Sequence, residues 1–65
     1  MKVTYDKETN AVYIQFKDET IDESDEDKIG GVIIDYAADG SVVGIEVLNA
    51  SEKLSFPVKL DYVEV

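Results

Sequence analysis

The sequence predicts a small α+β domain that is mostly β: a four-stranded antiparallel meander of two hairpins, a short helix near residues 49–54, and a C-terminal strand or extended tail. Two observations support this fold class. Apolar and polar residues alternate in two pairs of short runs, as in half-buried strands. Each pair of runs is separated by a few turn-forming residues. A chain of 65 residues is expected to be a single small domain, residues 1–65, near the lower size limit for independent folding.

The first hairpin is predicted over residues 1–16. If residues 7–10 form a four-residue loop, one register brings all the apolar residues of the two runs to the same face. This register pairs Tyr5 with Val12, Val3 with Ile14, and Met1 with Phe16.

The second hairpin is predicted over residues 31–48, with residues 38–41 as the loop and Asp39-Gly40 at its tip. Asp-Gly is a strong hairpin signal because glycine accepts a positive φ without steric cost. The two hairpins align at an offset of 31 residues, which suggests a weak internal repeat. The expected register pairs Tyr36 with Val43, Ile34 with Ile45, and Val32 with Val47.

The segment between the hairpins, residues 17–30, is an acidic linker with seven carboxylates within residues 18–27. Like charges resist packing, so the linker is expected to be a mobile loop or a short charged edge strand. Its acids are candidates for a protein interface, in particular Asp22, Glu23, Asp25 and Glu26.

Residues 49–65 are expected to form a short helix and a tail. Asn49 or Ser51 is the predicted N-cap residue. The tail alternates as a strand would but also fits one face of a helix. Its β-branched and aromatic residues favour a strand, which Pro57 would confine to an edge or a strand start.

The opposite face of the sheet is predicted not to be purely polar, because Ile33, Val42 and Leu48 point to it. The helix, the tail or a second copy of the chain could cover the sheet, so a homodimer is one of the alternatives. Tyr13 falls on this opposite face, where an exposed tyrosine would be an interface anchor. Tyr13, Ile33 and Val42 are therefore further candidates for an interface.

The net charge of −9 restricts the partners. Six lysines stand against fifteen acids, so neither nucleic acid nor an anionic membrane surface is expected as a direct partner. A basic protein would be attracted by this field. The sequence has no cysteine, no signal peptide pattern and no apolar run of membrane-spanning length, so a cytoplasmic location is expected.

The carboxylates Asp35, Asp39 and Glu46 could form a catalytic pair or serve the scaffold, and the second interpretation is favoured. Asp39 suits the turn, and no histidine is present to activate a serine. Asp25 and Asp27 have the spacing of a calcium loop, but Ile29 and Tyr36 occupy positions where such a loop needs ligands. No catalytic, cofactor-binding or metal-binding residue and no cofactor is predicted, so a non-enzyme is expected.

The runs YDKETNAVYIQF and GVIIDYAADGSVVGIEVLNAS make the chain resemble the domain of unknown function 2283 family over residues 2–51. That family of small bacterial and archaeal proteins has no assigned activity, so the resemblance transfers no catalytic residue. It implies a partner-binding, antitoxin-like role. Residues that match the family pattern are Tyr5, Asp6, Ala11, Tyr13, Ile14, Gly31, Val32, Asp35, Tyr36, Asp39, Gly40, Val43, Gly44, Ile45, Glu46, Leu48, Ala50 and Ser51.

These observations lead to one expected function and one alternative. The expected function is a non-enzymatic protein–protein interaction module that binds a basic partner by electrostatic steering and edge pairing. The alternative is a domain that binds a small ligand or a hard cation such as Ca²⁺ or Mg²⁺.

Overall fold

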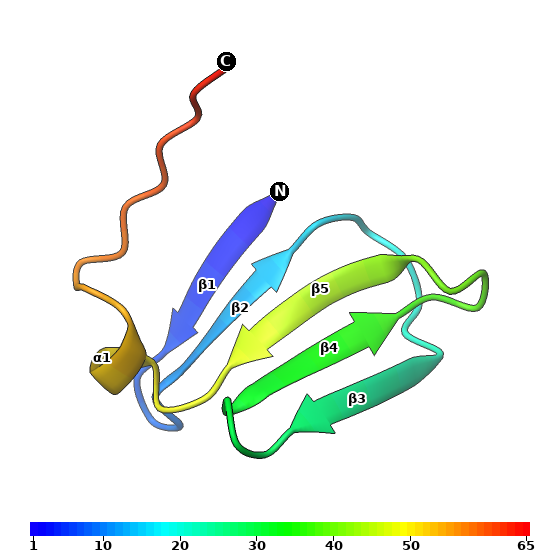
Figure 1. Ribbon diagram of the computed structural model, residues 1–65, viewed down its shortest axis with the longest axis horizontal. Coiled ribbons are helices and arrows are strands. Elements are labelled where there is room, and N and C mark those ends of the chain that lie inside the picture. The colour runs from blue at the N-terminus through cyan, green and yellow to red at the C-terminus, as the bar shows by residue number, and fades with distance from the viewer.

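One antiparallel sheet of five strands, with the spatial order β1-β2-β5-β4-β3, dominates the computed structural model, which describes residues 1–65 (Figure 1). A single short helix follows the last strand. The elements in chain order are β1 (Lys2–Asp6), β2 (Ala11–Gln15), β3 (Glu23–Asp27), β4 (Val32–Tyr36), β5 (Val42–Val47) and α1 (Ala50–Lys53).

The predicted registers of both hairpins are confirmed over most of their length. In the first hairpin Val3 is opposite Ile14 and Tyr5 is opposite Val12. In the second, Ile34 is opposite Ile45 and Val32 is opposite Val47. Face matching of the apolar residues therefore determines the pairing within each hairpin.

The first hairpin differs from the prediction at its open end, and the second differs beside its turn. Tyr36 pairs with Val42 rather than with Val43, because a bulge interrupts the register at Asp35 and Tyr36. Met1 lies outside β1, and Phe16 lies outside β2, so the predicted pair between them is not part of the sheet. The Asp39-Gly40 turn is confirmed, and Gly40 has a φ of 86°.

The prediction of four strands is wrong, because the acidic linker contributes a fifth. Residues 23–27 form β3, which pairs with β4 from Glu23 opposite Tyr36 to Asp27 opposite Val32. The alternative of a charged edge strand is thus confirmed, and a loop over the whole linker is not. Hydropathy could not show this strand, because all five of its residues are exposed.

The two hairpins join through their second strands, β2 and β5. This pairing is antiparallel and places Ile14 opposite Ile45 and Val12 opposite Val47. Ile14 and Ile45 are also equivalent positions in the offset of 31 residues between the hairpins. The weak repeat in the sequence therefore corresponds to an approximate two-fold relation between the hairpins, centred on the Ile14–Ile45 pair.

Asn49 is the N-cap residue of helix α1, as one of the two alternatives predicted, but the capping hydrogen bonds come from the turn between β1 and β2. Asn49 precedes the helix in a left-handed conformation, with a φ of 51°, and its side chain makes no capping hydrogen bond. Asn10 does the capping from a distance. Its carbonyl oxygen accepts from the Ala50 N–H at 2.9 Å and its Oδ1 accepts from the Ser51 N–H at 3.1 Å. A helix N-terminus accepts such partners from any segment, so local sequence did not reveal this one.

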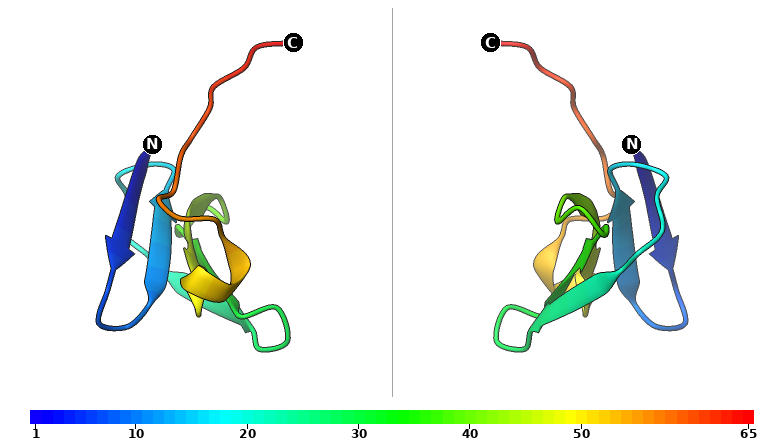
Figure 2. Two further views of the ribbon diagram at one scale, coloured as in Figure 1. Left: turned by 90° about the vertical axis from the view of Figure 1, so that its left-hand side faces the viewer. Right: turned by 90° about the vertical axis from the view of Figure 1, so that its right-hand side faces the viewer.

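The tail after Leu54 contains no regular structure and pairs with no strand, so the favoured strand is wrong and the extended alternative is confirmed. Near the start of the tail the ring of Phe56 lies 4.6 Å from that of Tyr5. Beyond this contact the chain runs away from the sheet, past the N-terminal end of β1 (Figures 1 and 2).

Few side chains are fully buried, and Val12 is one of the largest of them. Val12 lies in β2 between Tyr5 and Val47 and is only 1% exposed. We predict that Val12→Ala lowers the free energy of unfolding by about 2 kcal/mol, because it leaves a cavity that the neighbours cannot fill. Val63→Ala in the tail, where the residue is 74% exposed, should change it by less than about 0.5 kcal/mol. Urea unfolding of both variants tests this, and equal effects would contradict the placement of the core.

Candidate functional site

A hydrogen-bonded network of three strands lies on the sheet face opposite the Val12 side chain, and we call it the Tyr13 network. Its centre is Asp35, which is only 8% exposed. Asp35 Oδ2 accepts from the Tyr13 hydroxyl at 3.0 Å, and Oδ1 accepts from the Ser24 hydroxyl at 2.6 Å. The carboxylate of β4 therefore links the central strand β2 to the edge strand β3.

Gly44 makes this network geometrically feasible. It lies in β5 between β2 and β4, directly opposite Asp35. A Cβ atom at Gly44 would lie 2.6 Å from Cζ of Tyr13 and 2.7 Å from the carbonyl oxygen of Ile14. The Tyr13 ring thus crosses β5 over the backbone of Gly44, which only a residue without a side chain permits.

The network stabilises the protonated form of Tyr13. Burial raises the pKa of the Tyr13 hydroxyl above its ordinary value of 10.0, and the hydrogen bond to Asp35 and the charges of Asp35 and Glu46 add to the effect. A tyrosine that holds its proton so firmly is a hydrogen-bond donor and a poor general base. Asp35 and Glu46, for which the sequence favoured a scaffold role over a catalytic pair, flank this donor hydroxyl on one face of the sheet.

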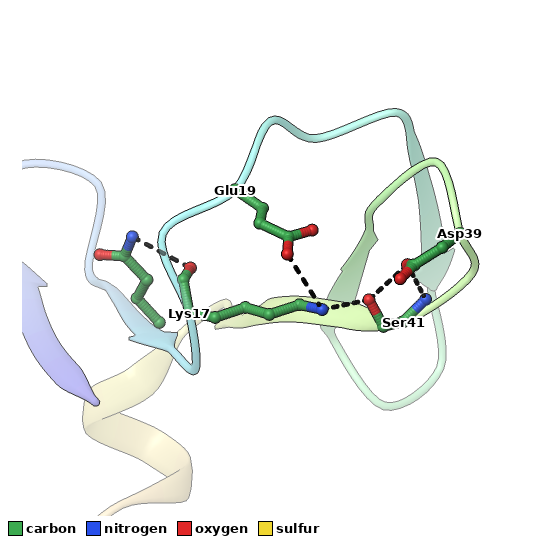
Figure 3. Close-up of polar contacts among 5 residues, drawn as sticks. Lys17, Glu19, Asp39 and Ser41 are labelled. Atoms are coloured by element: carbon green, nitrogen blue, oxygen red, sulfur yellow. Dashed lines mark hydrogen bonds and ion pairs between the residues drawn. The ribbon is translucent and has the colours of Figure 1, made fainter.

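A second polar cluster joins the linker to the turn between β4 and β5 (Figure 3). The Lys17 ammonium donates to the Ser41 hydroxyl and lies 3.7 Å from a carboxylate oxygen of Glu19. The Ser41 hydroxyl and N–H in turn donate to Asp39 Oδ1, at 2.5 and 2.9 Å. These hydrogen bonds from Ser41 lower the pKa of the Asp39 carboxyl. Asp39 is therefore a turn residue, and the cluster fixes the path of the linker into β3.

Strand β3 forms an exposed acidic edge, which we define as residues 23–27. It occupies the end of the strand order, so only β4 pairs with it. Two interface candidates from the sequence, Glu23 and Asp25, share a sheet face, because alternate residues of a strand point the same way. Glu26 lies on the other face, and Asp22 directly precedes the strand and donates its N–H to the Tyr36 carbonyl at 2.8 Å.

The remaining interface candidates are Tyr13, Ile33 and Val42. They lie on the sheet face that carries the Tyr13 network or beside the turn between β4 and β5. Tyr13 is half-buried and its hydroxyl is already bonded to Asp35, which leaves less of it free than an exposed anchor would offer. Ile33 and Val42 are also half-buried. Their role in an interface stays a prediction. The sequence showed the separate residues of the Tyr13 network but not the network, because the network depends on two strand pairings, that of β2 with β5 and that of β3 with β4.

Metal sites and membrane spans are two other features that the structure bears on. No three histidine, cysteine, aspartate or glutamate side chains come together in a way that could hold a metal ion. The binding of a small ligand or a hard cation stays an alternative prediction. No helix is long and apolar enough to cross a membrane.

The raised pKa of Tyr13 leads to a prediction about alkaline pH. The folded state retains the Tyr13 proton above the pKa of the unfolded chain, which is about 10. Unfolding then releases a proton, so stability falls as the pH rises from this value towards the higher folded pKa. Tyr13→Phe should make this alkaline loss smaller, whereas Tyr62→Phe in the exposed tail should leave it unchanged. Urea unfolding between neutral pH and pH values above about 10 measures both, and parallel curves for wild type and Tyr13→Phe would contradict the network.

A second prediction concerns Gly44. We expect Gly44→Ala to destabilise the protein by about 2 kcal/mol, because the added methyl group meets both the Tyr13 ring and the Ile14 backbone oxygen. Removal of the ring should relieve only part of the strain, since the Ile14 backbone remains. The free energy of unfolding of Gly44→Ala, Tyr13→Ala and the double variant measures this. A double variant no less stable than Tyr13→Ala alone would show that the backbone contact is not restrictive.

Comparison with known proteins yields one family. No curated protein and no solved structure gives a significant match to the chain. A family model described as "Protein of unknown function (DUF2283)" matches residues 2–51, which include all five strands and the first residues of α1. The Tyr13 network lies within the matched region. The chain belongs to the DUF2283 family of proteins of unknown function.

Proposed function

We propose that this protein is a non-enzymatic interaction module whose acidic edge binds a basic, extended segment of a partner protein. The observation that carries the proposal is that the most acidic part of the chain is also an unpaired sheet edge. A strand at an edge offers backbone N–H and C=O groups to an added strand, and its side chains select the sequence of that strand.

The charge of the edge is not neutralised within the chain. Seven carboxylates lie within residues 18–27, and the one ion pair of the protein joins Lys17 to Glu19. All five residues of β3 are exposed. An approaching basic segment therefore meets carboxylates that have no lysine partner in the folded chain, which accelerates encounter and stabilises the complex.

The same charges restrict the kind of partner. Two acidic edges cannot pair with each other without bringing like charges close together, so they resist self-association. The other sheet edge, β1, carries Lys2 and Asp6 and has no such excess charge. A lysine- or arginine-rich strand is thus favoured at β3 and not at β1.

Side-chain hydrogen bonds anchor the acidic edge and the linker that leads into it, and an edge that is ordered before binding loses less entropy. Ser24 in the middle of β3 donates to Asp35, and the Lys17 cluster fixes the linker that leads into the strand. The Tyr13 network therefore supports the proposed binding edge rather than performing chemistry.

The test uses a short synthetic peptide that alternates lysine and valine. We expect binding that weakens as ionic strength rises, measured by calorimetry. Neutralising one sheet face of the acidic edge with Glu23→Gln, Asp25→Asn and Asp27→Asn together should weaken binding about tenfold or more. The matched control is Glu8→Gln, Asp61→Asn and Glu64→Gln, which changes the net charge by the same three units and should weaken binding less than about threefold.

Two further peptides separate edge pairing from simple attraction. Each is N-methylated at alternate residues, so that one or the other edge of the peptide can no longer donate hydrogen bonds. The proposal requires that at least one of them binds more weakly than the parent peptide. Equal binding of all three peptides, or equal losses for the two triple variants, would overturn it.

A further inference from the structure

One face of the sheet is only partly covered, and we call it the open face. A row of four aliphatic side chains crosses it, because Val3 is opposite Ile14, Ile14 is opposite Ile45, and Ile45 is opposite Ile34. A second row adds Val47 and Val32 beside Val12. Of these residues only Val12 is fully buried; the others are half-buried. The open face consists of Val3, Ile14, Val32, Ile34, Ile45 and Val47.

The chain does not supply enough structure to cover this face. Helix α1 has four residues and docks on the turn between β1 and β2. Phe56 covers Tyr5 at the β1 side, where the tail borders a groove of about 620 Å³ lined by Val3, Tyr5 and Lys7. The tail then leaves the sheet, and Figure 2 shows no element over β4 and β5 beyond the helix.

The molecule exposes more surface than a compact monomer of its mass. Its accessible surface is 5116 Å². A compact monomer of 7.2 kDa is expected to expose about 4,100 Å². The excess of about 1,000 Å² is shared between the exposed tail, residues 55–65, and the half-buried side chains of the open face.

We propose that a second copy of this chain covers the open face and forms a two-fold symmetric dimer of stacked sheets. The row of four side chains suits such a partner, because its two halves are equivalent. A two-fold axis parallel to the strands, between β2 and β5, places Ile14 over the partner's Ile45 and Val3 over the partner's Ile34. Such an interface uses the same surface on both subunits and closes after two copies.

Charge favours a two-fold axis parallel to the strands over an axis perpendicular to them. Glu23, Asp25 and Asp27 continue the open face at the β3 side, opposite residues of β4. An axis perpendicular to the strands would superpose the two β3 strands and their carboxylates. The axis parallel to the strands places β3 of one subunit beside the β1 side of the other, where Lys7 borders the groove. The outer edge of β3 stays free, so the dimer would carry two acidic edges.

Neighbouring isoleucines provide a matched pair of variants. Ile34 points to the open face, whereas Ile33 points to the opposite face, between Glu26 and Glu46. Both are half-buried in β4, and threonine keeps the β-branched shape while adding a hydroxyl.

We expect wild type at twice the 7.2 kDa chain mass by light scattering and sedimentation, with dissociation on dilution. Ile34→Thr should raise the dissociation constant about tenfold or more, because each dimer contains the change twice, and Ile33→Thr should change it less than about threefold.

A second measurement does not depend on any variant. If the dimer forms, the midpoint of thermal unfolding of wild type rises with protein concentration. A wild-type mass of 7.2 kDa at all concentrations, with a constant midpoint, overturns the proposal. So does a dimer that Ile33→Thr dissociates and Ile34→Thr does not, because the opposite face would then be the interface. Circular dichroism of each variant establishes that it is folded, and neither result depends on binding of a basic peptide.

Discussion

The pairing of β2 with β5 is the interaction on which the rest of the structure depends. Each hairpin forms locally, but neither buries its apolar side chains by itself. Their antiparallel contact, with Ile14 opposite Ile45 at its centre, converts two hairpins into one sheet. It also places Gly44 beside Tyr13, so that the tyrosine ring can cross β5 and reach Asp35. The edge strand β3 then attaches to β4 through Ser24 and the backbone ladder.

The two faces of this sheet divide the structural tasks. One face carries the Tyr13 network, in which every buried side-chain polar atom has a partner. The other carries aliphatic rows that a four-residue helix and the start of the tail cover only in part. A short chain has little surface to bury, and without cysteine it has no disulfide to compensate. The proposed dimer and the proposed acidic edge therefore use different surfaces of one sheet.

The fold could be predicted where neighbouring residues determine it. The alternation around Asp39-Gly40 indicated the second hairpin and most of its register. It did not indicate the bulge at Tyr36, because a bulge changes the count of residues on one strand without changing their hydropathy. Strand β3 was only one of two alternatives for the linker. Its acids have low strand propensity, so the strand depends on its pairing with β4, which the local sequence does not show. The capping of α1 by Asn10 could not be predicted either, because more than forty residues of sequence separate Asn10 from the helix.

The sequence alone determined the two hairpins, the family and the charge, because alternation, turn residues and composition act over short distances. Tertiary structure decided which carboxylates are accessible. Asp35 is buried and shared by two hydroxyls, whereas Glu23 and Asp25 are exposed on a free edge. These residues are chemically alike in the sequence. They differ because of their places in the strand order. Asp35 lies on an inner strand, where hydroxyl donors from β2 and β3 reach it. The acids of β3 lie on the outermost strand and face water.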